Sequence, residues 1–244
     1  MVFTRLVHVV IDCADPARQA RFWSAALGWE ISDSAAAVWP AGYSYPEPAA
    51  LPLVFAAVPE PKTTKNRLHL DLATTSREHQ RSEVERLLGL GAAAADIGQG
   101  DVPWTVLSDP EGNEFCVLDP RPVYAGTGPV AAVVCGCAEP ADVADFWELA
   151  SGFVRHESED GFVSLRSPTG TGPFLELVRV PDRKTVKDRV HLDLCPWPDA
   201  GQDTAVAELL AAGATRADIG QGDDVPWTVL ADPGGGEFCV LTPL

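Results

Sequence analysis

Basic residues are scarce in this sequence. Of its 244 residues, 18 are lysine or arginine and 35 are aspartate or glutamate, which gives a formal net charge of −17. This balance argues against nucleic acid as a partner, because neutralising phosphates needs a basic face. It argues equally against binding to anionic membranes. Only four of the basic residues are lysines, and they lie in two similar segments: Lys62, Lys65, Lys184 and Lys187.

Long apolar runs and export signals are lacking too. The apolar segment 49–58 is short and broken by prolines, well under the roughly 20 residues that a membrane-spanning helix needs. The first 13 residues lack the basic flank of a signal peptide. The six cysteines form no CxxC pair and are too sparse for a disulfide scaffold. We therefore expect a cytoplasmic protein of one or two domains, long enough to bury a core without disulfides.

The chain contains an internal repeat. The segment ADIGQGDVPWTVLSDPEGNEFCVL at 95–118 recurs at 217–241, with identity at about 21 of 24 aligned positions and one inserted Asp. Two further pairs occur in the same order: KTTKNRLHLDL with KTVKDRVHLDL, and CADPARQARFW with CAEPADVADFW. Between the halves, DPRPVYAGTGP has the composition of a linker. We predict two homologous domains, residues 1–120 and 128–244, with a linker at 121–127.

Each half shows one order of elements, strand, helix and short strands, repeated twice. In the first half, Asp15 and Pro16 have the chemistry of a helix N-cap and first turn. A second helix is predicted to begin at a capping box of Thr75 and Glu78. Its buried face would hold Val84, Leu87 and Leu88. Strands are predicted at 3–13, within 29–58, at 67–73, at 102–107 and at 114–118. The expected fold class is α+β, with two tandem domains, each of two βαβββ modules that form a curled sheet with an open cleft.

Strand alternation separates the side chains of each strand into two faces. Val7, Val9, Ile11 and Cys13 are predicted to face the core, as are the leucines of RLHLDL and Phe115 and Val117 of EFCVL. The polar residues then share the opposite face. In the first half these are His8, Asp12, Arg67, His69, Asp71, Glu114 and Cys116; in the second half they are Arg189, His191, Asp193, Glu237 and Cys239.

The pattern HVVIDCADPARQARFWSAALGW, followed by NRLHLDL and DPEGNEF, resembles the vicinal oxygen chelate superfamily. That superfamily includes glyoxalase I, the fosfomycin- and bleomycin-resistance proteins and the extradiol dioxygenases. More narrowly, KxxKNRLHLDL with DPEGNEFCVL is similar to its glyoxalase-like branch, in a tandem two-domain form. The resemblance covers both halves apart from the linker. It implies βαβββ modules curled around a cleft in which a divalent metal accepts two substrate oxygens.

The resemblance also implies three metal ligands: one on the first strand, one on the strand opening the second module, and one on the last strand. In the first half these positions hold His8, His69 and Cys116. In the second half they hold Ala132, His191 and Cys239, so one histidine is missing. Both halves have cysteine where the superfamily usually has glutamate.

Two interpretations of these residues remain open. Two imidazoles and a thiolate would suit a zinc-type metal. Alternatively, the cysteines are small apolar residues, and the histidines are structural, with Asp71 and Asp193 as partners. Should modules pair across the halves, His8 would join His191 and Cys239 instead. Either way only one complete set forms, so we expect at most one metal per chain.

The lysine loops and two tryptophans are further candidates. The loops place positive charge before a cleft-facing strand, where Arg67 and Arg189 could attract an anionic substrate. Alternatively, the lysines neutralise acids such as Glu60, Asp182 and Asp188. Trp104 and Trp227, in the repeated VPWTVL, could form the wall of a pocket for a flat apolar ligand, although aromatic residues are more often core.

Three functions are compatible with these residues. The first is a small-molecule-binding protein for an aromatic or antibiotic-like ligand, held in a cleft bounded by Asp12, Arg67, Asp71, Trp104, Glu114, Arg189, Asp193, Trp227 and Glu237. The alternative is an enzyme, a lyase, isomerase or dioxygenase with one divalent metal and with Glu114 or Asp71 as base. The third is an interaction domain without a ligand. The expected assembly is an intramolecular pseudo-dimer, either monomeric or homodimeric.

Overall fold

The computed structural model describes residues 4–45, 50–181, 184–222 and 224–243. The first module comprises β1 (Thr4–Cys13), α1 (Pro16–Leu27), β2 (Glu30–Ile31), β3 (Ala37–Trp39) and β4 (Leu53–Ala57). The second comprises β5 (Leu68–Leu72), α2 (Arg77–Leu90), β6 (Ala93–Ala94), β7 (Thr105–Ser108) and β8 (Glu114–Val117). A 3₁₀ turn, η1 (Pro122–Tyr124), lies in the linker.

The second half repeats this order. The third module comprises β9 (Val130–Cys137), α3 (Pro140–Ser151), β10 (Val154–Glu159), β11 (Phe162–Arg166) and β12 (Phe174–Arg179). The fourth comprises β13 (Val190–Pro196), α4 (Gln202–Ala211), β14 (Thr215–Arg216), β15 (Thr228–Ala231) and β16 (Glu237–Val240). The predicted α+β fold of βαβββ modules is therefore confirmed.

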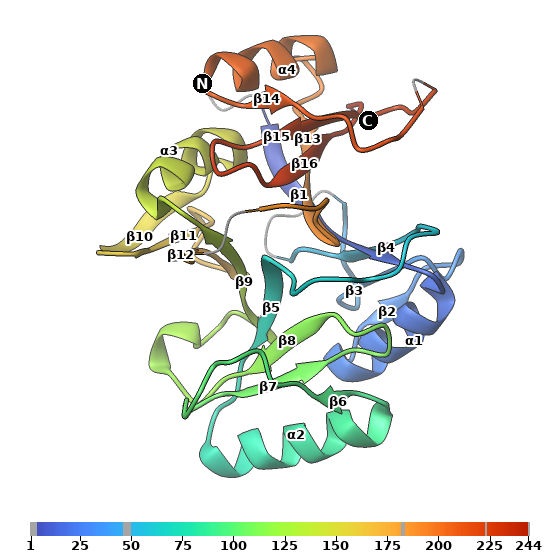
Figure 1. Ribbon diagram of the computed structural model, residues 1–244, viewed down its shortest axis with the longest axis vertical. Coiled ribbons are helices and arrows are strands. Elements are labelled where there is room, and N and C mark those ends of the chain that lie inside the picture. The colour runs from blue at the N-terminus through green and yellow to red at the C-terminus, as the bar shows by residue number, and fades with distance from the viewer. Residues whose placement is uncertain (1–3, 46–49, 182–183, 223, 244) are drawn as a thin grey trace.

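Each sheet takes one module from each half of the chain (Figure 1). The first sheet has the strand order β14-β15-β16-β13-β1-β4-β3-β2, so it combines modules one and four. The second sheet, β10-β11-β12-β9-β5-β8-β7-β6, combines modules three and two. The joining ladders, β1 with β13 and β5 with β9, are both antiparallel. The alternative that modules pair across the halves is the one this molecule adopts.

A bulge changes the alternation of β1. The register shifts between Leu6 and His8, so Val7 is the extra residue. Leu6, rather than the predicted Val7, therefore joins Val9 in the main core. The equivalent shift in the ladder of β5 with β9 lies at Ala131. In β1 the bulge leaves His8 opposite Asp193 and on the open face, which we define in both sheets as the face away from the helices.

The helices begin and end at capping residues. Asp15 accepts a hydrogen bond from the Arg18 amide at the start of α1, as predicted. In α2 the N-cap is Ser76, which accepts from the His79 amide, so the predicted capping box at Thr75 lies one residue too early. On the predicted buried face of α2, Leu87 is fully buried, but Leu88 is 42% exposed and does not belong to that face.

One continuous core lies beneath the helices of both sheets. Trp23 and Trp147 belong to this core, and each donates its indole N–H to a buried carboxylate, Asp109 and Asp232 respectively. Burial raises the pKa of both carboxyls, while hydrogen bonds to their oxygens oppose the rise. In the part of the chain that the structure describes, no helix has the length and apolar character needed to cross a bilayer.

Candidate functional site

The open face of the first sheet brings together two histidines, a carboxylate and a thiol. His8 Nδ1 lies 3.3 Å from Asp193 Oδ2, and the other oxygen of Asp193 lies 3.8 Å from His191 Nε2. The same His191 nitrogen lies 3.6 Å from Cys239 Sγ. These residues come from β1, β13 and β16, hence from both halves of the chain. We call them the first-sheet cluster.

Burial raises the pKa of the Cys239 thiol, and the negative charge of Asp193 adds to the rise. Without a metal the sulfur is therefore a protonated thiol in contact with His191. The ligand atoms of His191, Asp193 and Cys239 all lie within 4.8 Å of one another, as the ligands of one ion require, and His8 adjoins this group through its 3.3 Å contact with Asp193. Two nitrogens, an oxygen and a sulfur also form a chemically suitable zinc set. His191, Asp193 and Cys239 thus fit a metal, and His8 lies beside them.

The open face of the second sheet carries a smaller set. His69, Asp71 and Cys116 present ligand atoms within 4.8 Å of one another. His69 Nε2 lies 3.4 Å from Asp71 Oδ1. The position equivalent to His8 is Ala132, which stands opposite Asp71 in the ladder of β5 with β9. Among the described residues, each sheet thus has a His-Asp-Cys group, and only that of the first sheet has a second histidine, His8, in contact with its aspartate.

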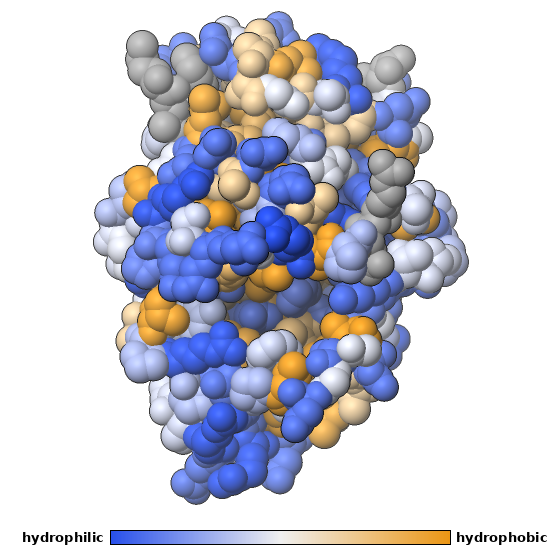
Figure 2. Space-filling view, turned by 60° about the vertical axis from the view of Figure 1, so that its left-hand side comes forward, coloured by the Kyte–Doolittle hydropathy of each residue, from blue (hydrophilic) through white to orange (hydrophobic). Residues whose placement is uncertain are grey.

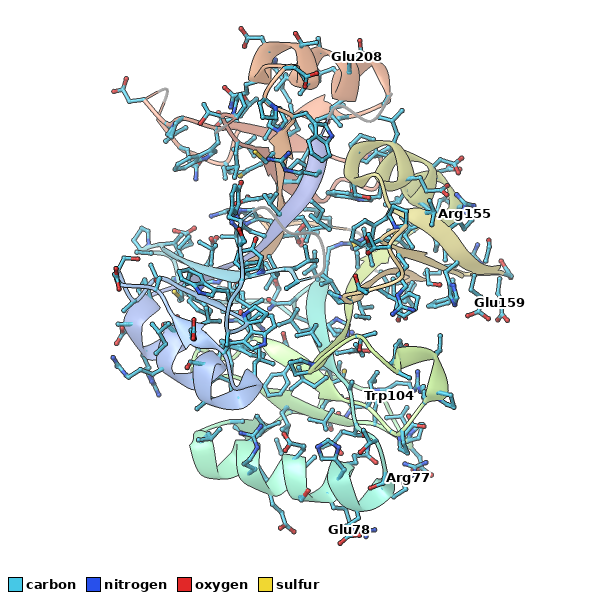
Figure 3. All side chains as sticks on the ribbon, turned by 180° about the vertical axis from the view of Figure 1, so that it is seen from behind. Arg77, Glu78, Trp104, Arg155, Glu159 and Glu208 are labelled. Carbon is cyan, nitrogen blue, oxygen red and sulfur yellow. The ribbon has the colours of Figure 1, made fainter. Side chains whose placement is uncertain are left out.

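The second sheet instead borders a cavity of about 490 Å³. Lys65, His69 and Cys116 line one part of it. Its apolar lining comprises Ile97, Trp104, Val134, Val178, Val180 and Val186, and the remaining lining residues are Gly136 and polar or charged residues such as Gln99, Arg67 and Lys184. In the side-chain view, Trp104 lies near the linker turn, and its ring receives a cation–π contact from Arg121, 5.7 Å from the ring centroid (Figure 3).

The space-filling view shows that the surface around β10–β12 is hollowed near the middle of the molecule (Figure 2). Apolar side chains lie in the hollow among charged ones. A site of this kind can hold the apolar body of a ligand while polar groups at its edge select the ligand's orientation.

The linker contributes a residue that sequence reasoning did not identify. Tyr124 packs edge-on against Phe174, with ring centroids 5.8 Å apart, and donates a 2.9 Å hydrogen bond to Glu176 Oε1. Burial raises the pKa of Glu176 to about 7, and the hydrogen bond from Tyr124 opposes the rise. The available signal was a lone carboxylate in the apolar strand FLELV.

The glutamate proposed as a base is engaged elsewhere. Glu114 accepts a 2.7 Å hydrogen bond from Lys62 Nζ and another from the Asn66 amide. Its counterpart Glu237 pairs with Lys184 and accepts from the Asp188 amide. Lys62 and Lys184, the first lysines of the two loops, thus each pair with a glutamate on the last strand of their own half.

Arg67, Arg189 and Lys187 make contacts between modules. Arg189 donates to the carbonyl oxygens of Glu60 and Asp12, and Arg67 donates to that of Gly136. Lys187 pairs with Asp12 at 2.7 Å and with Glu60 at 3.2 Å. The neutralising role is thus confirmed for Glu60, and for Asp188, which lies 3.5 Å from Lys184. Asp182 lies outside the described residues.

Trp227 stands apart from its counterpart Trp104. Its Nε1 donates a 2.8 Å hydrogen bond to Gln221, and its ring borders a separate shallow depression on the surface of the fourth module. The two repeated tryptophans therefore have different surroundings, and only Trp104 lines the cavity of the second sheet.

Paired βαβββ modules, with candidate ligands on the open face of curled sheets, define a protein of the vicinal oxygen chelate type. A family model described as a glyoxalase-like domain matches residues 8–118 and again residues 132–241. The chain therefore belongs to the glyoxalase-like domain family, in tandem form.

Solved structures share the fold at low sequence identity. Glyoxalase I from Zea mays is 13% identical, with a TM-score of 0.61, over 98% of this chain and 92% of that one. A Bacillus subtilis protein provisionally named a dioxygenase is 14% identical, with a TM-score of 0.62, over 99% and 85%. Among curated proteins, no sequence matches the chain.

Proposed function

We propose that the protein binds a small molecule with a flat apolar body in the cavity of the second sheet. The observation that supports this proposal is the cavity of about 490 Å³ with Ile97, Trp104 and Val178 in its lining. Apolar walls give such a ligand its affinity, and nearby polar groups such as His69 give orientation. This is the binding function that the sequence favours, assigned to one of the two sheets.

The repeated tryptophans provide a matched test. In the titration calorimeter, we expect the neutral probe 2-naphthamide to bind the native protein and to bind the Trp104→Ala variant at least tenfold more weakly, because the variant loses an aromatic wall. Trp227→Ala removes the same side chain outside the cavity and should leave binding unchanged. Equal loss in both variants, or no binding by the folded native protein, would contradict the proposal.

The first-sheet cluster supports a second candidate function, that of a metal-dependent lyase, isomerase or dioxygenase. His8, His191, Asp193 and Cys239 would hold the ion, which when bound supplies a Lewis acid for a substrate oxygen. Asp193 lies between the two imidazoles and fixes their orientation. Asp71, the base candidate of the sequence, lies on the second sheet, where it contacts His69, so it does not belong to this site.

Elemental analysis of protein purified without a histidine tag tests this candidate. We expect one divalent metal per chain, lost in the Cys239→Ala variant because a thiolate ligand is removed. Cys116→Ala is the matched control and should keep the metal, since its sheet has Ala132 in place of the first histidine. Two metals per chain would contradict the single site, and a native protein without metal would remove the enzyme candidate.

A further inference from the structure

Lys65 and Lys187 occupy equivalent positions of the repeat but have different surroundings. Lys187 is neutralised by Asp12, which is 2% exposed, and by Glu60. The position equivalent to Asp12 in the other half is Gly136, which has no side chain. Lys65 has no hydrogen-bond or ion-pair partner among the described residues. Among the described residues, Lys65 thus has no counterpart of the Asp12 carboxylate, and the counterpart of Glu60 is Asp182, which lies outside them.

The side chain of Lys65 lies in the lining of the second-sheet cavity. Lys65 and Gly136 both line the cavity of about 490 Å³, together with His69 and Trp104. The positive charge of Lys65 also acts on Cys116. Burial raises the pKa of the Cys116 thiol, and the charge of Lys65 opposes this rise. Of the other described cationic groups in the lining, Lys184 is held by Glu237 and Asp188, and Arg67 donates to the Gly136 carbonyl. Lys65 is thus the ammonium available to a ligand.

The balance of charge at this site opposes that of the whole molecule. The chain carries a formal net charge of −17, which repels anions at long range. Lys65 is exposed, so solvent screens part of its charge, but it lies in the lining of the cavity, where it can pair with the anionic end of a bound ligand. A ligand that fits both features has one anionic group and an apolar body.

We propose that the second-sheet cavity is selective for a small organic acid, whose carboxylate pairs with Lys65 and whose apolar body packs against Trp104, Ile97 and Val178. This inference rests on the proposed binding function and adds the chemical class of the ligand. The first sheet would lack this selectivity, because the ammonium group of Lys187, which is equivalent to that of Lys65, already pairs with Asp12.

A pair of probes that differ in charge tests the inference. By titration calorimetry at pH 7 and low salt, we expect 2-naphthoate to bind the native protein roughly tenfold more tightly than the neutral, nearly isosteric 2-naphthamide. Lys65→Gln should abolish this preference, so that 2-naphthoate and 2-naphthamide bind the variant with equal affinity. Arg81→Gln, which removes one positive charge on the exposed side of α2, should leave the preference intact.

A second variant changes the charge balance without touching the lysine. Gly136→Asp restores the carboxylate found at Asp12 and should lower the preference for 2-naphthoate several-fold. A Cβ at this position would approach the Val180 methyl groups to 3.1 Å, so folding of the variant is checked by its melting curve. Lys65→Gln keeps the test decisive even where Gly136→Asp fails to fold.

The outcomes separate the two proposals. Equal affinity of the native protein for both probes would overturn the charge selectivity and leave the cavity as a binding site. A preference for 2-naphthoate that survives Lys65→Gln would overturn the role of Lys65. Binding of neither probe would overturn both proposals together.

Discussion

Glu176 is a carboxylic acid buried among apolar residues, with 6% of its surface exposed. Its pKa rises from 4.5 to about 7, because burial disfavours the ionised form. Below pH 4.5 both the folded and the unfolded chain carry the proton at this site. Between pH 4.5 and 7 only the unfolded chain loses it, so the free energy of unfolding falls as the pH rises through this window.

Replacing Glu176 by Gln should remove that pH dependence. The variant keeps a side-chain oxygen for the Tyr124 hydroxyl but cannot ionise. The free energy of unfolding of the variant, relative to that of the native protein, should increase by on the order of 3 kcal/mol between pH 4.5 and pH 7. Urea unfolding at several pH values measures this difference.

Glu159→Gln is the control for this measurement, since Glu159 lies on β10 of the same sheet with its side chain in solvent (Figure 3). Its stability difference from the native protein should be the same at every pH. A Glu176→Gln curve that runs parallel to the native curve would show that Glu176 ionises normally in the folded protein.

At the residue scale, the sequence identified the cluster residues and named Asp71 and Asp193 as partners of the histidines, which the contacts of His69 and His191 match. His8, His191 and Cys239 could be placed on one kind of face by strand alternation. Glu176 could not be linked to Tyr124, because the two residues lie 52 positions apart and meet only through the folding of the linker. Lys65 and Lys187 likewise looked identical in sequence, and only their neighbours distinguish them.

At the scale of elements, the start of α2 tests how well capping is understood. Ser76 accepts a hydrogen bond from the His79 amide at 3.0 Å, so Ser76→Ala should lower the free energy of unfolding by about 1 kcal/mol. Thr75→Ala should cost less, because its hydroxyl contacts only the His79 ring. Chemical denaturation of both variants makes the comparison, and a larger loss in Thr75→Ala would restore the capping box predicted from sequence.

The sequence predicted where strands and helices occur better than it predicted their details. Repeated apolar alternation marks β5 and β8 clearly, because Leu68, Leu70 and Phe115 all face the core. The bulge at Val7 was not visible, since no local signal distinguishes Val7 from its apolar neighbours. A bulge is decided by pairing with β13, whose residues lie far along the chain.

At the scale of the whole molecule, each sheet contains strands from both halves of the chain. Separating the halves would break the ladders of β1 with β13 and β5 with β9 and would divide the continuous core. A protease site inserted after Gly126, which is exposed in the linker, should therefore allow cleavage without dissociation. Light scattering after size exclusion should give the mass of the intact chain, whereas urea should release the two fragments.

Two peaks of half the mass under native conditions would mean that the halves are independent of each other. The predicted boundaries at 1–120 and 128–244 describe the repeat along the chain, and the family match at 8–118 and 132–241 follows the same division. They do not describe the sheets, each of which crosses that division.

The sequence by itself determined the tandem repeat, the βαβββ modules and the family, because these depend on local patterns that recur twice in one chain. It also limited the complete set of two histidines and a cysteine to one, since Ala132 replaces the second copy of His8. The tertiary structure decided which modules pair, and so which His and Cys stand beside His8. It also decided which lysine pairs with Asp12, because such contacts join residues more than a hundred positions apart.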